Sequence, residues 1–233
     1  MHSINNNFRY EKKFILNSIY KHRMLYLIST SKLKFIKQYN PRIVNSIYLD
    51  TFNLTSYFDN INGLSARKKF RIRWYNQKNN SDFTDPSLEI KIKEGRVGYK
   101  KKFKLNKNEF IYKDLKFKNL LNIFNNNFIR DDKTQYLPIL QPKIHVNYER
   151  EYYQSIDDIR ITVDKKIIFY EAQYNKLLFK SSNSKFFKNI IEIKFKENFK
   201  NRISEKIRKT PFNFNRSSKY LLGLSKLYGL SYI

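Results

Sequence analysis

Hydrophobic and charged residues alternate strictly in several short stretches of the chain. In residues 69–74, KFRIRW, every second residue is a cation and the residues between them are apolar. The same alternation returns in residues 89–93, 159–164 and 192–196, and less cleanly in residues 10–16 and 100–105. Because the side chains of a strand point alternately to its two faces, each stretch predicts a strand with one apolar and one charged face.

Apolar residues at helical spacing predict three helices. Residues 18–28 follow Asn17, a residue type that often caps the first turn of a helix. Residues 115–124 and 217–228 carry leucines and aromatic residues along one stripe. We expect these helices to cover the apolar faces of the strands.

The charged faces of the predicted strands repeat Glu, Lys and Arg and contain few Ser or Thr, the usual residues of a solvated face. An ordinary sheet with its charged face in water is one interpretation. The other is a closed antiparallel barrel, with charged faces pointing inward and apolar faces outward beneath the helices. Both are α+β folds. No linker or change of composition divides the chain, so we expect a single domain over residues 1–233.

The charge balance indicates a polyanionic partner. The chain has 47 Lys and Arg against 20 Asp and Glu, a formal net charge of +27. Polyphosphate, nucleotides, nucleic acid and an anionic membrane all meet this description. We do not expect nucleic acid as the ligand, because a duplex cannot enter the narrow interior of the closed barrel described above.

Missing residue types and motifs exclude several kinds of site. With no Cys, the chain can hold no thiolate zinc site, iron–sulfur cluster or cysteine nucleophile. Its three His are scattered, and His145, between Ile144 and Val146, is expected to be a structural or surface residue. Its five Gly form neither common nucleotide-binding glycine motif. No apolar run approaches the roughly 20 residues that span a bilayer, and no hydrophobic signal region begins the chain, so we expect a cytoplasmic protein without a transmembrane segment.

Eight short segments carry a resemblance to a known family. In order, they are RYEKKF (9–14), VNSIYLDT (44–51), RIRWY (71–75), LEIK (88–91), YER (148–150), RITVD (160–164), IEIKF (191–195) and SKY (218–220). Together they resemble the VTC domain of the triphosphate tunnel metalloenzymes, in the CYTH-like superfamily. The resemblance implies a closed antiparallel eight-stranded β-tunnel lined by basic residues. It also implies a polyphosphate polymerase that uses ATP and a divalent metal, Mn²⁺ or Mg²⁺.

The resemblance further implies the residues of the site. The family's phosphate-binding positions match Lys13, Arg71, Arg73, Lys91, Lys102, Arg150, Arg160, Lys194 and Lys219, and the run 100–102 leaves the register of Lys102 open by one or two residues. The catalytic candidates are Arg71, Arg73 and Glu192. The metal candidates are Glu192 and Glu11, with Glu89 and Asp164 as further carboxylates.

These residue types suit phosphoryl transfer, which needs phosphate oxygens to be held and neutralised more than it needs covalent chemistry. Guanidinium groups bind phosphate oxygens in pairs, and lysines add point charges. Carboxylates combined with phosphate oxygens suit Mg²⁺ or Mn²⁺. The alternative role for each Glu is to pair with a neighbouring Lys in a crowded cationic environment.

The most concrete prediction is ATP-dependent synthesis of inorganic polyphosphate. One alternative is hydrolysis of triphosphate or of a nucleoside triphosphate, with water as the acceptor in the same tunnel. The other is a noncatalytic polyphosphate-binding module, kept because no Asp or Glu follows Lys219. The sequence leaves the oligomeric state and the length of the phosphate chain open.

Overall fold

The computed structural model describes residues 9–29, 34–77, 84–95, 97–105, 140–172, 182–208, 213 and 217–231. Its strands are β1 (Arg9–Leu16), β2 (Ile36–Asp50), β3 (Arg67–Gln77), β4 (Thr84–Glu94), β5 (Val97–Lys104), β6 (Gln141–Gln154), β7 (Arg160–Glu171), β8 (Asn183–Phe186) and β9 (Asn189–Lys196). Its helices are α1 (Ser18–Ser29), α2 (Thr55–Ile61), the short 3₁₀ helix η3 (Glu197–Phe199), α4 (Lys200–Arg208) and α5 (Lys219–Tyr228).

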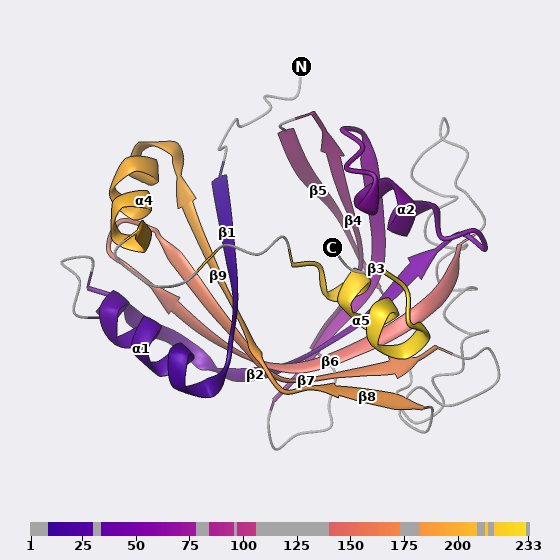
Figure 1. Cartoon of the computed structure of the whole chain (residues 1–233), viewed down its shortest axis with the longest axis horizontal. Helices are drawn as coiled ribbons and strands as arrows, with labels where there is room; N and C mark the ends of the chain where they lie inside the picture. Colours follow the sequence, from indigo (N-terminus) through magenta and orange to yellow (C-terminus); the bar gives the residue numbers. More distant parts are fainter. Residues whose placement is uncertain are drawn as a thin grey trace. The chain divides into compact units, whose positions relative to one another are not determined.

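The strands form one sheet in the order β1-β9-β7-β6-β2-β3-β4-β5, with β8 paired to β7 (Figure 1). The pairs β1–β9, β2–β3, β3–β4, β4–β5 and β7–β9 are antiparallel. This confirms an antiparallel α+β protein. The closed eight-stranded tunnel is not confirmed, because the path of paired strands ends at β1 and at β5 in the described part of the chain, and β8 is a ninth strand. Alternation within one strand predicts its two faces but not its neighbours, so closure cannot be inferred from it.

The chain divides into two compact units, each built from three separate segments. Unit 1 comprises residues 1–41, 149–167 and 187–217, and unit 2 comprises residues 42–148, 168–186 and 218–233. The single domain expected over residues 1–233 stays a prediction.

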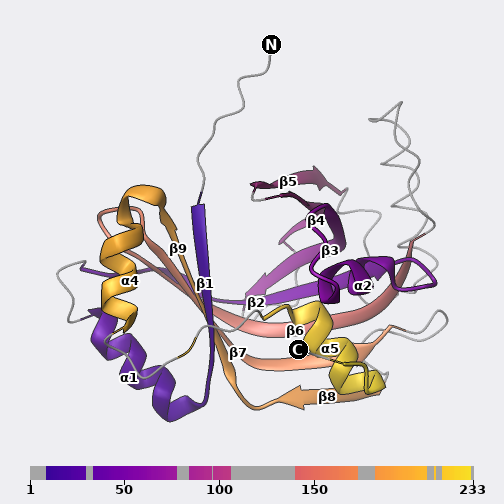
Figure 2. The same cartoon turned by 45° about the horizontal axis from the view of Figure 1, so that its top comes forward.

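In unit 1, α1 and α4 cover the apolar face of β1, β9 and β7. Figures 1 and 2 show both helices on the same side of β1 and β9. Met24 of α1 and Ile203 of α4 join one buried cluster with strand residues such as Phe14, Val163 and Ile191. These strand residues occupy the apolar positions of the alternating pattern, which is why the helices pack there.

In unit 2, the apolar face of β2, β3 and β4 builds a second core. Its buried residues include Ile47, Ile72, Trp74, Leu88 and Ile90. The strand register places the charged positions on the opposite face, where Arg71 lies across from Glu89 and from Tyr48. Both cores therefore confirm the alternation that the sequence predicts.

The helices differ in part from their predictions. The helix expected at 18–28 is α1, and the one expected at 217–228 is α5. Helix α5 does not cover the apolar core of β2–β4, because its Tyr220 stacks on Tyr48, which shares the face of Arg71. At Gly223, α5 also packs against the apolar side chains of Ile144 and Phe169. The helix expected at 115–124 lies outside the described residues. Of the described helices, none has both the length and the apolar composition to cross a membrane.

Candidate functional site

Two groups of ion-paired residues lie on the charged faces of the strands, one in each unit. We call Arg71, Arg73, Glu89 and Lys100 the Glu89 cluster, and Glu11, Lys13, Glu192 and Lys194 the Glu192 cluster. Each group follows from the register: Arg71 of β3 pairs with Glu89 of β4, and Lys13 of β1 pairs with Glu192 of β9. The Glu89 cluster therefore combines residues of three consecutive strands, and the Glu192 cluster joins the first and last strands of the described chain.

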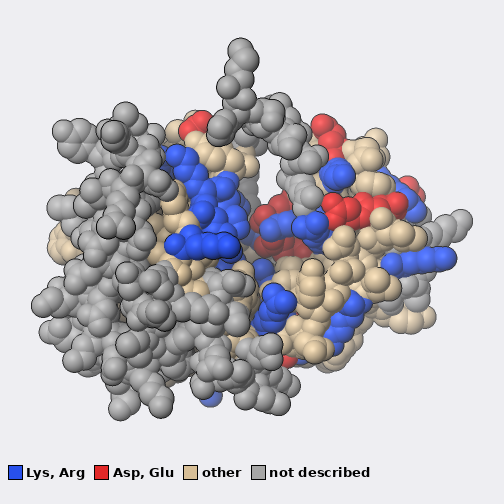
Figure 3. Space-filling model, turned by 180° about the vertical axis from the view of Figure 1, so that it is seen from behind, with Lys and Arg blue, Asp and Glu red and all other residues tan. Residues whose placement is uncertain are grey.

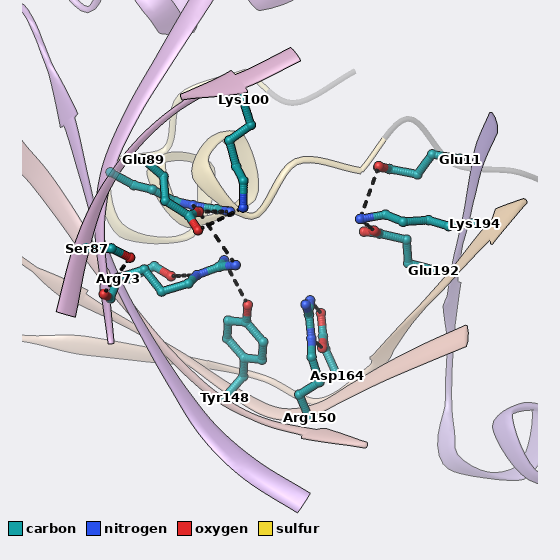
Figure 4. Close-up of polar contacts among 12 residues, drawn as sticks. Glu11, Arg73, Ser87, Glu89, Lys100, Tyr148, Arg150, Asp164, Glu192 and Lys194 are labelled. Carbon is teal, nitrogen blue, oxygen red and sulfur yellow. Dashed lines mark hydrogen bonds and ion pairs between the residues drawn. The ribbon is translucent and has the colours of Figure 1, made fainter. Parts of the chain in front are cut away.

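Glu89 is buried at the centre of its cluster, with its side chain 3% exposed. Arg71 binds Oε2 of Glu89 through both Nε, at 2.7 Å, and Nη2. Lys100 Nζ lies 3.1 Å from Oε1, and Arg73 Nη1 lies 3.9 Å from Oε2 (Figure 4). One carboxylate thus faces three cations, and the cluster keeps an excess of positive charge.

The hydrogen bonds that Arg73 donates, together with two nearby lysines, extend this cationic region within unit 2. Arg73 donates from Nε to Ser46 Oγ at 3.1 Å and from Nη2 to Tyr148 Oη at 3.2 Å. Lys219 Nζ lies 4.8 Å from the centre of the Tyr148 ring, a cation–π contact. Lys69 Nζ donates to Ser218 Oγ at 3.1 Å. The first residues of α5 therefore belong to the same group of polar contacts.

The electrostatics of unit 2 follow from this crowding of cations. Burial would raise the pKa of Glu89, but Arg71, Arg73 and Lys100 outweigh it and lower the pKa to about 2. Burial would likewise raise the pKa of Tyr48, and Arg71, Arg73 and Lys219 lower it below its ordinary value. Both shifts show that negative charge is favoured here.

The Glu192 cluster joins two carboxylates through two shared lysines. Lys13 Nζ lies 2.6 Å from Glu11 Oε1 and 3.7 Å from Glu192 Oε2. Lys194 Nζ lies 2.6 Å from Glu192 Oε1 and 3.8 Å from Glu11 Oε2 (Figure 4). Lys13 also donates to the carbonyl oxygen of Ser217 at 3.2 Å. The carboxylates of Glu11 and Glu192 therefore converge on the same two ammonium groups.

Arg150 belongs to the same unit and adds to the field at Glu192. Its Nε and Nη2 bind the two carboxylate oxygens of the fully buried Asp164, at 2.5 and 2.8 Å. Burial would raise the pKa of Glu192, but the charges of Lys13, Lys194 and Arg150 hold that pKa well below its ordinary value. Glu192 is thus ionised throughout the physiological range.

The structure separates some of the predicted residues from these clusters. Arg160 is exposed and pairs with Asp158 Oδ1 at 2.9 Å. Lys91 and Lys102 are exposed on β4 and β5. Lys102 pairs with Glu89 in the backbone register, yet it is Lys100 whose side chain reaches that carboxylate. The run of three lysines at 100–102 had already left open which of them would take this position.

Several contributors to these sites were not singled out in the sequence. Lys69 and Lys100 lie in alternating stretches of the sequence and Tyr148 lies in the segment 148–150, but only the folded structure shows which side chains they meet. Glu89 ranked as a further metal carboxylate, whereas the structure makes it the centre of a cation cluster. Asp164 likewise serves as the partner of Arg150.

His145 is a structural residue, as expected. It is fully buried, and its Nε2 lies 3.0 Å from Asn45 Oδ1. Its ring stacks between Trp74 and Tyr170, and burial lowers its pKa to about 3. It is therefore neutral at physiological pH.

Comparison with known families identifies the fold that carries these clusters. The VTC domain family matches residues 8–228, nearly the whole chain. This chain belongs to the VTC domain family. The match includes every residue of both clusters, and it spans both units. The VTC resemblance of the eight sequence segments is thereby confirmed. Comparison with curated proteins gives no match.

Solved structures share the fold of this VTC domain at low sequence identity. The protein PH1819 from Pyrococcus horikoshii is 15% identical, with a TM-score of 0.50, over 94% of this chain and 99% of that chain. A proposed adenylate cyclase from Vibrio parahaemolyticus is 10% identical, with a TM-score of 0.50, over 93% and 98% of the two chains. The protein HpAC1 from Hippeastrum, a proposed adenylyl cyclase with a dominant triphosphatase activity, has 13% identity and a TM-score of 0.49 over 94% and 96%. The two structures at 0.50 support a common fold.

The surface of this VTC domain carries its charge in groups. Figure 3 shows Lys and Arg side chains gathered on one face, with Asp and Glu beside some of them. In the part of the chain that the structure describes, no group of three or more His, Asp or Glu is arranged to hold a metal ion by itself.

Proposed function

We propose that this VTC domain is a phosphotransferase that acts in a basic site, and most concretely that it makes inorganic polyphosphate from ATP. Family membership supports a phosphoryl-transfer or other triphosphate-related activity. The observation that carries the proposal is the Glu89 cluster, where three cations meet one buried carboxylate. Such an excess of charge is stabilised when a polyanion binds.

The side chains of the Glu89 cluster suit phosphate oxygens. Arg71 and Arg73 come from alternate positions of β3, so their guanidinium groups share one face. Planar guanidinium groups bind phosphate oxygens in pairs and neutralise the charge that spreads over them during transfer. We assign phosphate binding and orientation to Arg71 and Arg73, with Lys100 and Lys219 as added point charges. The exposed Lys91, Lys102 and Arg160 stay in the proposed phosphate-binding set.

The Glu192 cluster fits a divalent metal in the chemistry of its donors. Glu11 and Glu192 supply hard oxygens, and both approach the same two ammonium groups, so a position next to both carboxylates already holds positive charge. We propose that these two residues hold Mn²⁺ or Mg²⁺ together with phosphate oxygens. When bound, the metal would polarise and neutralise phosphate oxygens. Lys13, Lys194 and Arg150 lower the pKa of Glu192 and so keep it ionised, the form in which a carboxylate binds a metal.

Purified protein with ATP and either Mn²⁺ or Mg²⁺ tests this proposal. Long phosphate polymers on a gel, with ADP formed and little free phosphate, are the expected result. Free phosphate without polymer would indicate that the activity is hydrolysis and not synthesis. Tight polyphosphate binding without turnover would indicate a noncatalytic binding module. The absence of both turnover and binding would overturn the proposal.

A further inference from the structure

Asp50, at the end of β2, is a fully buried carboxylate that lies outside both clusters. Its Oδ1 accepts hydrogen bonds from the backbone N–H of Thr51 at 2.8 Å and of Ser56 at 2.9 Å. Its Oδ2 accepts from the N–H of Tyr57 at 3.1 Å and from the hydroxyl of Tyr220 at 2.6 Å. Four donors thus satisfy this carboxylate, and three of them are backbone N–H groups just before α2 or in its first turn.

Tyr220 is the donor that links Asp50 to α5. It is the second residue of that helix and is buried, and its ring stacks on Tyr48 with the centroids 5.4 Å apart. The residue before it is Lys219, which lies over the ring of Tyr148, and Tyr148 accepts a hydrogen bond from Arg73. The hydrogen bond to Asp50, together with the stacking on Tyr48, therefore ties to β2 the turn of α5 that presents a cation next to the Glu89 cluster.

Local capping and helix-dipole interactions contribute little to the stability of this turn. Ser218 occupies the N-cap position of α5 but makes no side-chain capping bond, and its hydroxyl oxygen accepts a hydrogen bond from Lys69. The first turn of α5 contains no acidic residue, and Lys219 places a positive charge at the positive end of the helix dipole. Local helix chemistry thus disfavours this arrangement, so a tertiary contact must stabilise it.

We propose that Tyr220 is a positioning residue for anion binding: its hydrogen bond to Asp50 holds the first turn of α5 so that Lys219 stays over Tyr148 beside Arg73. This inference rests on the proposed function, because it treats Lys219 as a ligand of phosphate. Tyr220 itself is buried and acts through its neighbour. It is therefore distinct from the residues that contact the anion.

The substitution Tyr220→Phe isolates the hydrogen bond. It keeps the ring that stacks on Tyr48, and it leaves Asp50 with its three backbone donors, so α2 stays capped. Tyr57→Phe is the matched control, because Tyr57 is also buried and donates from its hydroxyl to the carbonyl oxygen of Ser231 at 2.7 Å. The control removes one phenol hydroxyl from the same unit without touching the first turn of α5.

Tripolyphosphate binding is measured by calorimetry, and the thermal midpoint without ligand is measured beside it. We expect Tyr220→Phe to raise the Kd of tripolyphosphate about fivefold, the worth of one ordinary hydrogen bond, and Tyr57→Phe to leave it within about twofold. The two thermal midpoints without ligand should fall by similar amounts. Equal affinities for the two variants would overturn the inference, because Tyr220 would then be structural only.

A double-mutant cycle separates positioning from general destabilisation. If Tyr220 acts through Lys219, Tyr220→Phe should add little to the loss of affinity in a Lys219→Ala background. Additive losses would contradict the inference. If the unaltered protein does not bind tripolyphosphate, the proposed function fails and the inference fails with it. Normal binding with equal effects of both Phe variants rejects the inference alone.

Discussion

Glu192 has two possible roles: it binds a metal, or it only pairs with lysines. Its pKa is lowered by Lys13, Lys194 and Arg150, so it is ionised whether or not a metal is present. A carboxylate that only balances lysines contributes through charge, whereas a metal ligand contributes through its oxygens. The two roles therefore predict different results for the same substitution.

We expect Glu192→Gln to lower metal-dependent turnover of ATP by roughly 100-fold, the range for loss of a residue that supports a metal site. Metal-free binding of polyphosphate should be unchanged or tighter, because one repulsive negative charge is removed. Product formation and calorimetric affinity measure the two effects. Glu197→Gln is the matched control, since Glu197 is exposed and accepts a hydrogen bond from the Tyr10 hydroxyl at 3.0 Å, outside both clusters. Unchanged turnover would make Glu192 a partner of lysines only.

Glu89 makes a pH-dependent contribution to stability. Its pKa is about 2 in the folded protein and 4.5 ordinarily, so the folded state favours the ionised form. The stabilisation is therefore fully present above about pH 4.5 and is lost as the pH falls towards 2. At neutral pH, Glu89→Gln should lower the free energy of unfolding by about 3 kcal/mol, because it leaves Arg71, Arg73 and Lys100 without their common partner.

The difference in unfolding free energy between the unaltered protein and Glu89→Gln should shrink as the pH falls from 5 towards 2. Denaturant titrations at several pH values measure it. A difference that is constant with pH would mean that the pKa of Glu89 is not lowered by its cluster.

Helix α5 shows how a whole element depends on close packing at one position. A Cβ atom placed on Gly223 would lie 2.4 Å from Ile144 Cδ1 and 2.8 Å from Phe169 Cδ1, both on fully buried side chains. Glycine here allows the helix to approach β6 and β7 closely. The sequence places Gly223 inside an apolar helical stripe, but the neighbouring residues give no reason for a glycine at this position.

We expect Gly223→Ala to destabilise the protein by about 1 kcal/mol, because overpacking of ~1–3 kcal/mol exceeds the gain in helix propensity of about 1 kcal/mol. Chemical denaturation gives the change. Lys226→Ala, at an exposed position of the same helix, should change the free energy of unfolding by less than about 0.5 kcal/mol. Stabilisation by Gly223→Ala would show that Ile144 and Phe169 move aside at no cost.

At the scale of the whole molecule, the question is whether the net charge of +27 acts as a diffuse surface or as an organised site. Tripolyphosphate should raise the thermal midpoint by about 5–10 °C at a large excess over its Kd, whereas sulfate at equal charge concentration should raise it much less. The physical reason is that several fixed cations bind one linear anion together. Equal shifts for the two anions would indicate a diffuse basic surface.

A charge-conserving pair of variants sharpens this measurement. Arg71→Lys should reduce the shift caused by tripolyphosphate by about half, since lysine cannot reproduce paired guanidinium contacts. Arg202→Lys should leave it unchanged, because Arg202 is exposed on α4 and pairs with Asp157. An equal loss in both variants would mean that total charge, and not the geometry of Arg71, governs binding.

The sequence predicts which charged side chains of one strand share a face. The alternation in residues 69–74 predicts that Arg71 and Arg73 share a face, and the spacing of Glu192 and Lys194 predicts the same for them. Each prediction depends on the two-residue repeat of a single strand, which is a local property of the backbone. The VTC resemblance rests on short segments of the same kind, and the family match over residues 8–228 confirms it.

What the sequence by itself determined is therefore the type of element, the apolar and charged faces of each strand, the excess of positive charge and the family. What only the tertiary structure decided is which side chains meet across strands. Lys100 contacts Glu89 although Lys102 is the backbone neighbour of Glu89. Asp50 accepts a hydrogen bond from Tyr220, which lies 170 residues later in the sequence. The physical reason is that the two faces of a strand follow from the covalent geometry of its backbone. Which strands are neighbours, which side chains meet and where α5 packs depend on contacts between residues distant in sequence.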